Sequence, residues 1–208
     1  MTLTAKAEPI SQPQPVARGE LVLVVGPSGA GKDTLMLAAR DALAGDPRIL
    51  FARRIITRSS HDTAESHDTL PRERFDEARR QGAFLLSWQA HGLGYAIPRS
   101  VESHLAADGV VVANVSRTSI PEAERLVARV TVLHVTAPQE VLASRIAARG
   151  REPLSEVAAR LSRQPPLAIS TAELVEIVND ADVASAAARL TAVLTRLADR
   201  AAAHARRS

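Results

Sequence analysis

The sequence feature that most constrains the fold is a short apolar run that leads directly into a glycine-rich turn. The five apolar residues Leu21–Val25 precede the sequence GPSGAGKDT of residues 26–34. An uninterrupted apolar run of this length is typical of a strand buried on both faces of a parallel sheet. A helical pattern follows at about Lys32–Leu43. The sequence therefore predicts a buried strand, a tight loop and a helix in direct succession.

This succession of elements creates a phosphate-binding loop. Backbone amides of the loop and the positive end of the helix dipole attract phosphate oxygens, and the glycines let the backbone curl around the anion. Lys32 can reach the β- and γ-phosphates of a nucleotide, so it is predicted as a catalytic residue. The residues predicted to bind ATP are Gly26, Pro27, Ser28, Gly29, Ala30, Gly31, Lys32, Asp33 and Thr34.

The residue after the lysine departs from the common form of this loop. A hydroxyl residue usually stands there and gives an oxygen to Mg²⁺, whereas this chain has Asp33. A carboxylate also offers oxygen, so Asp33 is predicted to bind Mg²⁺ either directly or through water. The alternative is that Asp33 is only a helix-end carboxylate stabilised by the helix dipole, with Thr34 hydrogen-bonding nearby.

The rest of the chain alternates between strand and helix patterns. Further strands are predicted at about 49–56, 83–88, 110–115, 130–136 and 174–178. Helices are predicted to begin at Pro71, Pro121, Pro138 and Pro153, and an amphipathic helix rich in Ala and Arg ends the chain. Such alternation gives a parallel sheet covered by helices. The predicted fold class is α/β, a P-loop NTPase with three layers, α/β/α.

Composition limits the domain organisation and the partners. With 208 residues, of which 46% are hydrophobic, the chain fits one domain at 20–208, preceded by a disordered tail at 1–19. There is no cysteine, which excludes disulfides and Cys-bound zinc, and the cytoplasm is the expected compartment. No apolar run is long enough for a membrane span. The net charge is +3, but only five aromatic residues are available for stacking on bases, so no nucleic-acid partner is expected.

Several segments, taken together, resemble a known family. Besides the loop GPSGAGKDT, they are RRIITR, GAFLLSWQAHGLGYAIP, VVVANVS, VLASRIAARGREPLSEVAARL and EIVND. They span nearly all of residues 20–180 and resemble the guanylate-kinase branch of the nucleoside monophosphate kinases. Within that branch, the combination of GKD with SWQAHGLGY is similar to the ribose 1,5-bisphosphate phosphokinases of phosphonate catabolism. The resemblance implies an acceptor-binding region at about 50–100 and a lid at about 145–165.

The resemblance also implies roles for individual arginines and a tyrosine. Arg58 stands at the phosphate-binding arginine of the family's TTR segment, and Tyr95 stands at the second tyrosine of its YYG segment. Arg149 and Arg160 fall on the two lid arginines that clamp the transferring phosphates, so they join Lys32 as expected catalytic residues.

The positions that read guanine in guanylate kinases carry different residues here. Where that branch has a serine, a glutamate, a second hydroxyl and an aspartate, this chain has Arg54, Leu86, Ile97 and Ser116. Leu86 cannot accept a hydrogen bond from guanine, whereas Arg54 adds a positive charge. These changes fit a smaller and more anionic acceptor. Arg117, at the end of a predicted strand, is a further candidate to bind it.

The implied activity is transfer of the γ-phosphoryl group of ATP, with Mg²⁺, to ribose 1,5-bisphosphate, giving 5-phospho-α-D-ribose 1-diphosphate and ADP. One alternative is a guanylate or other nucleoside monophosphate kinase with altered base recognition. The other is a non-catalytic guanylate-kinase-like module that binds a protein partner. Lys32, Arg149 and Arg160 argue against the module, since such modules can lose these residues without penalty. The sequence does not indicate an oligomeric state.

Overall fold

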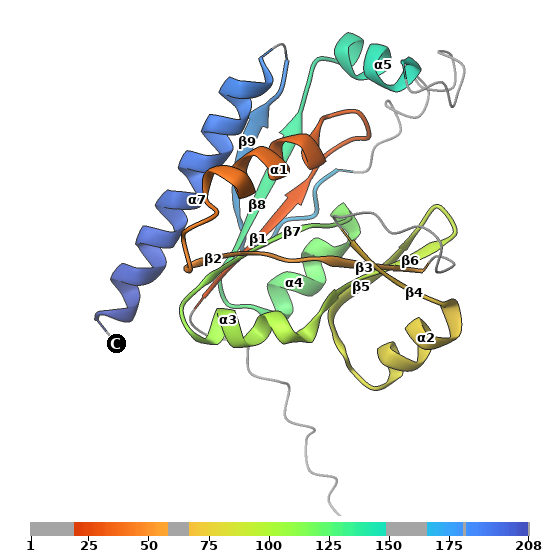
Figure 1. The fold of residues 1–208 in the computed structure, drawn as a ribbon, viewed down its shortest axis with the longest axis vertical. Helices are drawn as coiled ribbons and strands as arrows, with labels where there is room; N and C mark the ends of the chain where they lie inside the picture. Colours follow the sequence, from red (N-terminus) through yellow and green to blue (C-terminus); the bar gives the residue numbers. More distant parts are fainter. Residues whose placement is uncertain (1–18, 58–66, 149–165, 181, 208) are drawn as a thin grey trace, which may run out of the picture.

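A five-stranded parallel sheet forms the centre of the molecule (Figure 1). The computed structural model describes residues 19–57, 67–148, 166–180 and 182–207. Strands of the central sheet follow the order β2-β7-β1-β8-β9. Their bounds are Glu20–Val25 for β1, Ile49–Phe51 for β2, Val110–Asn114 for β7, Val130–Thr136 for β8 and Glu173–Val178 for β9.

Helices cover both faces of this sheet. Because side chains alternate along a strand, Val22 and Val24 of β1 join the core on one face, whereas Leu21, Leu23 and Val25 join the core on the other. The first core also holds residues of α1, α5 and α7, and the second holds residues of α3 and α4. These helices span Lys32–Ala42 (α1), Glu102–Ala106 (α3), Ile120–Leu126 (α4), Gln139–Ala147 (α5) and Val183–Ala205 (α7). The predicted three-layer α/β/α fold is confirmed.

A second, four-stranded sheet lies beside the central one (Figure 1). Its order is β4-β3-β6-β5, and β6 is antiparallel to both of its neighbours. Phe75 and Phe84 form a small separate core between this sheet and α2. The elements are Arg54–Thr57 (β3), His67–Leu70 (β4), Arg72–Arg80 (α2), Phe84–Ala90 (β5) and Leu93–Pro98 (β6). The sheet falls within the segment expected to bind the acceptor.

The prediction of one strand at 49–56 is wrong, because the structure divides this segment between two sheets. Ile49–Phe51 pairs with β7 in the central sheet, and Arg54–Thr57 pairs with β4 and β6 in the second. The chain changes sheets at Ala52 and Arg53. Two consecutive arginines, Arg53 and Arg54, cannot readily continue a strand that is covered by a helix layer, since charged side chains are rarely buried without partners.

Other sequence predictions have clear outcomes. The helices predicted from Pro71, Pro121 and Pro138 correspond to α2, α4 and α5. The helix predicted from Pro153 lies outside the described residues, as do residues 1–18 of the predicted tail. Strands β4 and β6 and helix α3 were not predicted. Among the helices within the described ranges, none is long and apolar enough to cross a membrane.

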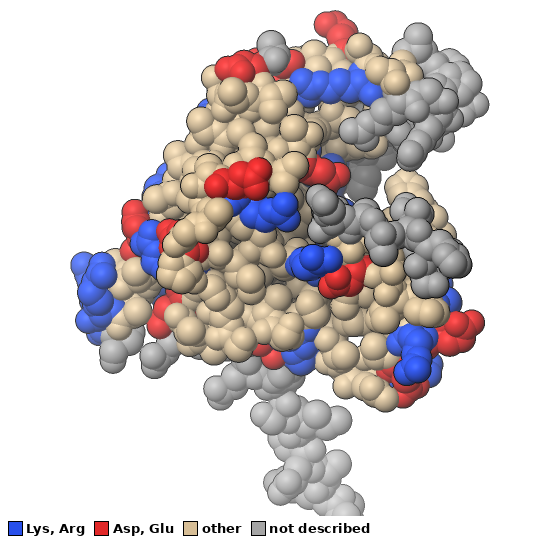
Figure 2. Space-filling view, in the orientation of Figure 1, with Lys and Arg blue, Asp and Glu red and all other residues tan. Residues whose placement is uncertain are grey.

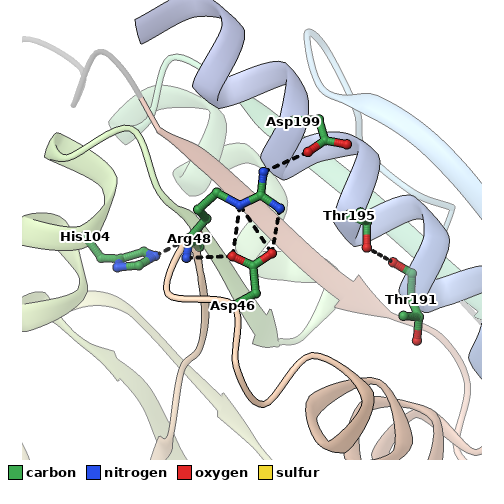
Figure 3. Close-up of polar contacts among 6 residues, drawn as sticks. All are labelled: Asp46, Arg48, His104, Thr191, Thr195 and Asp199. Carbon is green, nitrogen blue, oxygen red and sulfur yellow. Dashed lines mark hydrogen bonds and ion pairs between the residues drawn. The ribbon is translucent and has the colours of Figure 1, made fainter.

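Arg48 ties the amino-terminal edge of the central sheet to α7 (Figure 3). Its guanidinium donates to Asp46 at 2.7 and 2.9 Å and to Asp199 of α7 at 2.7 Å. The hydrogen bond from Arg48 lowers the pKa of the Asp46 carboxyl group. The backbone carbonyl of Arg48 accepts from His104 Nε2 at 3.0 Å, since a carbonyl oxygen can only accept. One residue thus joins a loop and α7 through its side chain and α3 through its backbone carbonyl.

A second network at the same edge holds a buried carboxylate. The Glu20 side chain, at the start of β1, is only 2% exposed. It accepts from Thr131 Oγ1 at 2.6 Å and from Arg200 Nη2 at 3.0 Å. Arg200 also donates to Glu173 at 2.6 Å. The first network uses the acidic Asp199 of α7, and the second uses the basic Arg200 of the same helix. On the face drawn in Figure 2, the described positive and negative side chains are also interspersed.

Candidate active site

The phosphate-binding loop lies between the end of β1 and the start of α1, as predicted. Gly26, Gly29 and Gly31 have φ values of 152°, 83° and 82°, which L side chains rarely adopt. A side chain at Gly26 would also meet the backbone of Val135 on β8. The Lys32 ammonium donates to the carbonyl oxygens of Gly26 and Pro27, both at 2.8 Å. These two hydrogen bonds hold the Lys32 ammonium over the loop.

Asn179, just after β9, is hydrogen-bonded to this loop. The residue is 1% exposed, and its Nδ2 donates to the Ala30 carbonyl at 2.8 Å. A side chain at Gly31 would collide with the same amide. The backbone carbonyl of Asn179 accepts a hydrogen bond from Arg145 of α5 at 2.9 Å. Sequence reasoning assigned Asn179 no contact, although a polar pair directly after an apolar strand is a signal that could have drawn attention to it.

Asp33 is held by a residue from a different strand. The Asn114 side chain, at the end of β7, donates from Nδ2 to Asp33 Oδ1 at 2.7 Å. The nitrogen must face the carboxylate, because an ionised carboxylate can only accept. Arg54 Nη2, on β3 of the second sheet, lies 3.9 Å from the same oxygen. Asn114 was missed as a site residue, although it is the first polar residue at the end of a buried parallel strand.

A pocket of about 440 Å³ lies between α1 and the segment that joins the two sheets. Its polar lining includes Asp33, Thr34, Arg54 and Asn114, and its apolar lining includes Phe51. The pocket therefore brings the start of the P-loop helix and the predicted acceptor residue Arg54 to one place.

Arg117 and His134 form a second polar cluster at the carboxyl ends of the strands. Arg117 Nη2 lies 3.3 Å from His134 Nε2, and His134 Nδ1 lies 3.2 Å from Glu176 Oε1. A guanidinium can only donate, so Nε2 accepts and Nδ1 carries the proton that is donated to Glu176. Burial lowers the pKa of His134 and, together with the positive charges of Arg117 and Lys32, outweighs Glu176, which raises it. This histidine is therefore neutral at pH 7.

The second sheet contributes one aromatic pair and a buried apolar pair. Trp88 and Tyr95, on adjacent strands, stack with ring centroids 5.6 Å apart. Leu86 and Ile97 are paired two register positions further along β5 and β6 and are 1% and 0% exposed. Both are members of the core beneath the central sheet. Two of the positions that the resemblance assigns to guanine recognition are therefore occupied by packed apolar side chains.

The structure brings together part of the predicted site. Lys32, Asp33, Thr34 and Arg54 lie around the start of α1, and Arg117 lies near Lys32 through His134. Predictions for Arg58, Arg149 and Arg160 concern residues outside the described ranges.

The residues at the start of α1 fit a magnesium ion. The Asp33 carboxylate is 81% exposed, and Thr34 lines the same pocket. Within the described ranges, no group of three or more His, Cys, Asp or Glu residues could hold a metal by itself. Mg²⁺ is commonly held by one or two carboxylates and completes its shell with substrate phosphates and water, and Asp33 offers one such carboxylate.

Comparisons with known proteins agree with this geometry. Ribose 1,5-bisphosphate phosphokinase PhnN of Methylobacterium radiotolerans is 51% identical over 176 residues, which are 85% of this chain and 97% of that protein. The protein of the same name from Agrobacterium fabrum is 39% identical over 178 residues, 86% of this chain and 97% of that protein. No family profile matches the sequence.

The fold has a solved counterpart. Guanylate kinase from Anaplasma phagocytophilum superposes with a TM-score of 0.61 at 17% identity, covering 86% of each chain. The phosphate-binding loop, the parallel sheet and the second sheet thus define a P-loop phosphotransferase with the guanylate-kinase fold. By its sequence identity to the curated proteins, the chain belongs to the ribose 1,5-bisphosphate phosphokinase family.

Proposed function

We propose that this kinase transfers the γ-phosphoryl group of ATP to the 1-phosphate of ribose 1,5-bisphosphate. The products are 5-phospho-α-D-ribose 1-diphosphate and ADP. The observation that carries this choice over a guanylate kinase is the burial of Leu86 and Ile97, at 1% and 0% exposure, where guanine would be read. Arg54, in contrast, lines the pocket beside the loop. The pocket thus places a guanidinium beside the loop, where it suits an anionic acceptor.

The reaction replaces one phosphate–oxygen bond by another. An oxygen of the acceptor 1-phosphate attacks the γ-phosphorus in line, and the bond from that phosphorus to the bridging oxygen of ADP breaks. A phosphate monoester has its second pKa near about 6 and is mostly ionised at pH 7, so no general base is needed. The chain's task is to align the two substrates and to neutralise charge.

Individual residues are proposed for these tasks. Lys32 and the loop amides bind the β- and γ-phosphates, and Arg149 and Arg160 neutralise charge on the transferring group. Arg58 and Tyr95 position the acceptor, with Arg54 and Arg117 beside it. Asp33 and Thr34 would hold Mg²⁺, which supplies positive charge to the phosphate oxygens when bound.

A direct comparison of two acceptors tests the proposal. ADP release is measured with ribose 1,5-bisphosphate and with GMP at saturating ATP and Mg²⁺. We expect kcat/KM to favour the sugar bisphosphate by at least about 100-fold, because guanine would leave polar groups unpaired on burial. Equal or better use of GMP would overturn the substrate assignment. Activity only on an alcohol would overturn the mechanism.

A further inference from the structure

Asp33 and Asn114 occupy two positions that have fixed roles in P-loop enzymes. There, the residue after the loop lysine is commonly a serine or threonine, and an aspartate from another strand completes the magnesium site. In this chain the carboxylate follows the lysine, as Asp33. Asn114 ends β7, the strand that pairs with β1, and lies opposite Val24 just before the loop. Relative to that common arrangement, the carboxylate of this chain follows the lysine, and the residue that ends the neighbouring strand is a neutral amide.

We propose that this exchange is functional, with Asp33 as the cation ligand and Asn114 as the residue that positions it. The inference rests on the proposed function. Asn114 is 7% exposed and fixed at the end of a buried strand, so its amide is a rigid donor. Its bond to Asp33 Oδ1 measures 2.7 Å. The exposed carboxylate of Asp33 is thereby held in one orientation over the pocket.

The charge of the Asp33 carboxylate explains why the residue that donates a hydrogen bond to it is an amide. The common pair of a hydroxyl and an aspartate, and the present pair of Asp33 and Asn114, each contain one carboxylate. An aspartate at position 114 would place two carboxylates within hydrogen-bond distance, where they repel each other. An apolar residue there would remove the donor and leave Asp33 without its fixed orientation. The amide is neutral and donates, which meets both requirements.

The Arg54 contact is consistent with this assignment. Arg54 Nη2 lies 3.9 Å from the same Oδ1 that accepts from Asn114. Both neighbours therefore lie on one oxygen of a side chain that is 81% exposed. The other carboxylate oxygen, Oδ2, thereby keeps room for a cation.

Exchanging the two residues tests the proposal. The set comprises the unchanged protein, Asp33→Ser, Asn114→Asp and the double variant with both changes. Isothermal titration measures ADP binding with Mg²⁺ and with EDTA, and ADP release measures turnover. In Asp33→Ser, which lacks a carboxylate at the site, we expect the Mg²⁺-dependent gain in ADP affinity to fall about 10-fold or more. The double variant has the common pair, a hydroxyl after the lysine and an aspartate on the neighbouring strand. Its Mg²⁺-dependent gain in ADP affinity should return to within about threefold of that of the unchanged protein.

Two further variants control for indirect effects. Asp41→Ser removes an exposed carboxylate from the far end of α1 and changes the net charge equally, so it should leave the Mg²⁺ dependence unchanged. Asn114→Ala removes only the donor and should weaken the Mg²⁺-dependent gain about 10-fold while ADP binding in EDTA persists. It keeps the proposal testable if the double variant fails to fold.

The outcomes separate this inference from the proposed function. A double variant no better than Asp33→Ser, or an unchanged Mg²⁺ dependence in Asn114→Ala, would overturn the exchange even if ribose 1,5-bisphosphate is a good substrate. Conversely, the ADP titrations need no acceptor. They would still support the exchange if the acceptor assignment failed.

Discussion

The two edges of the central sheet use charge in different ways. At the amino-terminal edge, Arg48 is bonded to two carboxylates, and Arg200 is bonded to Glu20 and Glu173. At the carboxyl-terminal edge, the Lys32 ammonium is bonded to two backbone carbonyls, and the Asp33 carboxylate to an amide. Charges at the first edge neutralise one another. At the second, the closest hydrogen bonds are made with neutral groups, and the charged neighbour of Asp33, Arg54, lies further away at 3.9 Å.

This difference has a physical reason. An ion pair satisfies both partners, so it stabilises the fold and has little further attraction for phosphate or metal. A neutral partner fixes the position of a charge without cancelling it. The comparison therefore predicts that variants of Lys32 and Asp33 at the carboxyl-terminal edge change activity and spare stability, whereas variants of Arg48 and Arg200 at the amino-terminal edge do the reverse.

The largest expected effect is at Lys32. Lys32→Ala removes the positive charge at the loop, so turnover should fall by at least about 10³-fold. The midpoint of urea unfolding should change far less, because the hydrogen bonds from Lys32 to Gly26 and Pro27 join neighbouring residues of one loop and not separate elements of the fold. Lys6→Ala, which changes the only other lysine, is the matched control. Near-normal turnover of Lys32→Ala would contradict the P-loop assignment.

Arg200→Ala should produce the largest loss of stability. It leaves Glu20, which is 2% exposed, without its positive partner inside the protein. We expect the free energy of unfolding to fall by about 2–4 kcal/mol, less than for a fully buried pair because Arg200 is partly exposed. Urea unfolding measures this change. Turnover of the folded protein should stay normal, and a selective loss of turnover would break the comparison.

Arg196→Ala is the control for that variant. Arg196 lies 3.6 Å from Glu173 and is 63% exposed, so its loss should cost less than about 0.5 kcal/mol. If Arg196→Ala and Arg200→Ala lower the free energy of unfolding equally, the burial of Glu20 is not the cause of the loss in Arg200→Ala.

Arg48→Ala should have a smaller effect of the same kind. Its partners Asp46 and Asp199 remain able to reach water, and the Arg48 side chain is itself 40% exposed. We expect a loss of about 1 kcal/mol in unfolding free energy, with normal turnover. The backbone bond from His104 to the Arg48 carbonyl is independent of the substitution. A loss as large as that of Arg200→Ala would show that the loop and α7 depend on this arginine more than its exposure suggests.

The smallest expected effect is a pH dependence at His134. Burial lowers the pKa of this histidine from its usual 6.5, so the unfolded chain takes up a proton at a higher pH than the folded protein does. Stability is therefore fully present above about pH 6.5 and is lost as the pH falls through the lowered folded pKa. Unfolding free energies at pH 7.5, 6.5 and 5.5 should show this loss. This loss of unfolding free energy at low pH should be smaller in His134→Gln. The control His91→Asn, which changes a histidine at an exposed turn, should retain it.

The sequence predicted elements that depend on neighbours along the chain. The apolar run before the loop, the glycines of the loop and the periodicity of α1 are local patterns, and each gave the correct element. The long helix α7 was likewise predicted from its amphipathic pattern. Strands β4 and β6 were missed because HDTL is mostly polar and LGYAIP contains glycine and proline, so neither shows a clear strand pattern.

The pairing of charged and polar groups was decided only by the tertiary structure. Asn114 contacts Asp33 across 81 residues of sequence, and Asn179 contacts the loop at Ala30 across 149 residues. Sequence alone determined that a phosphate-binding loop with an unusual aspartate is present, because glycine, lysine and the helix start act locally. It could not determine which residue orients that aspartate, because strand order, rather than spacing along the chain, places β7 and β9 beside the loop.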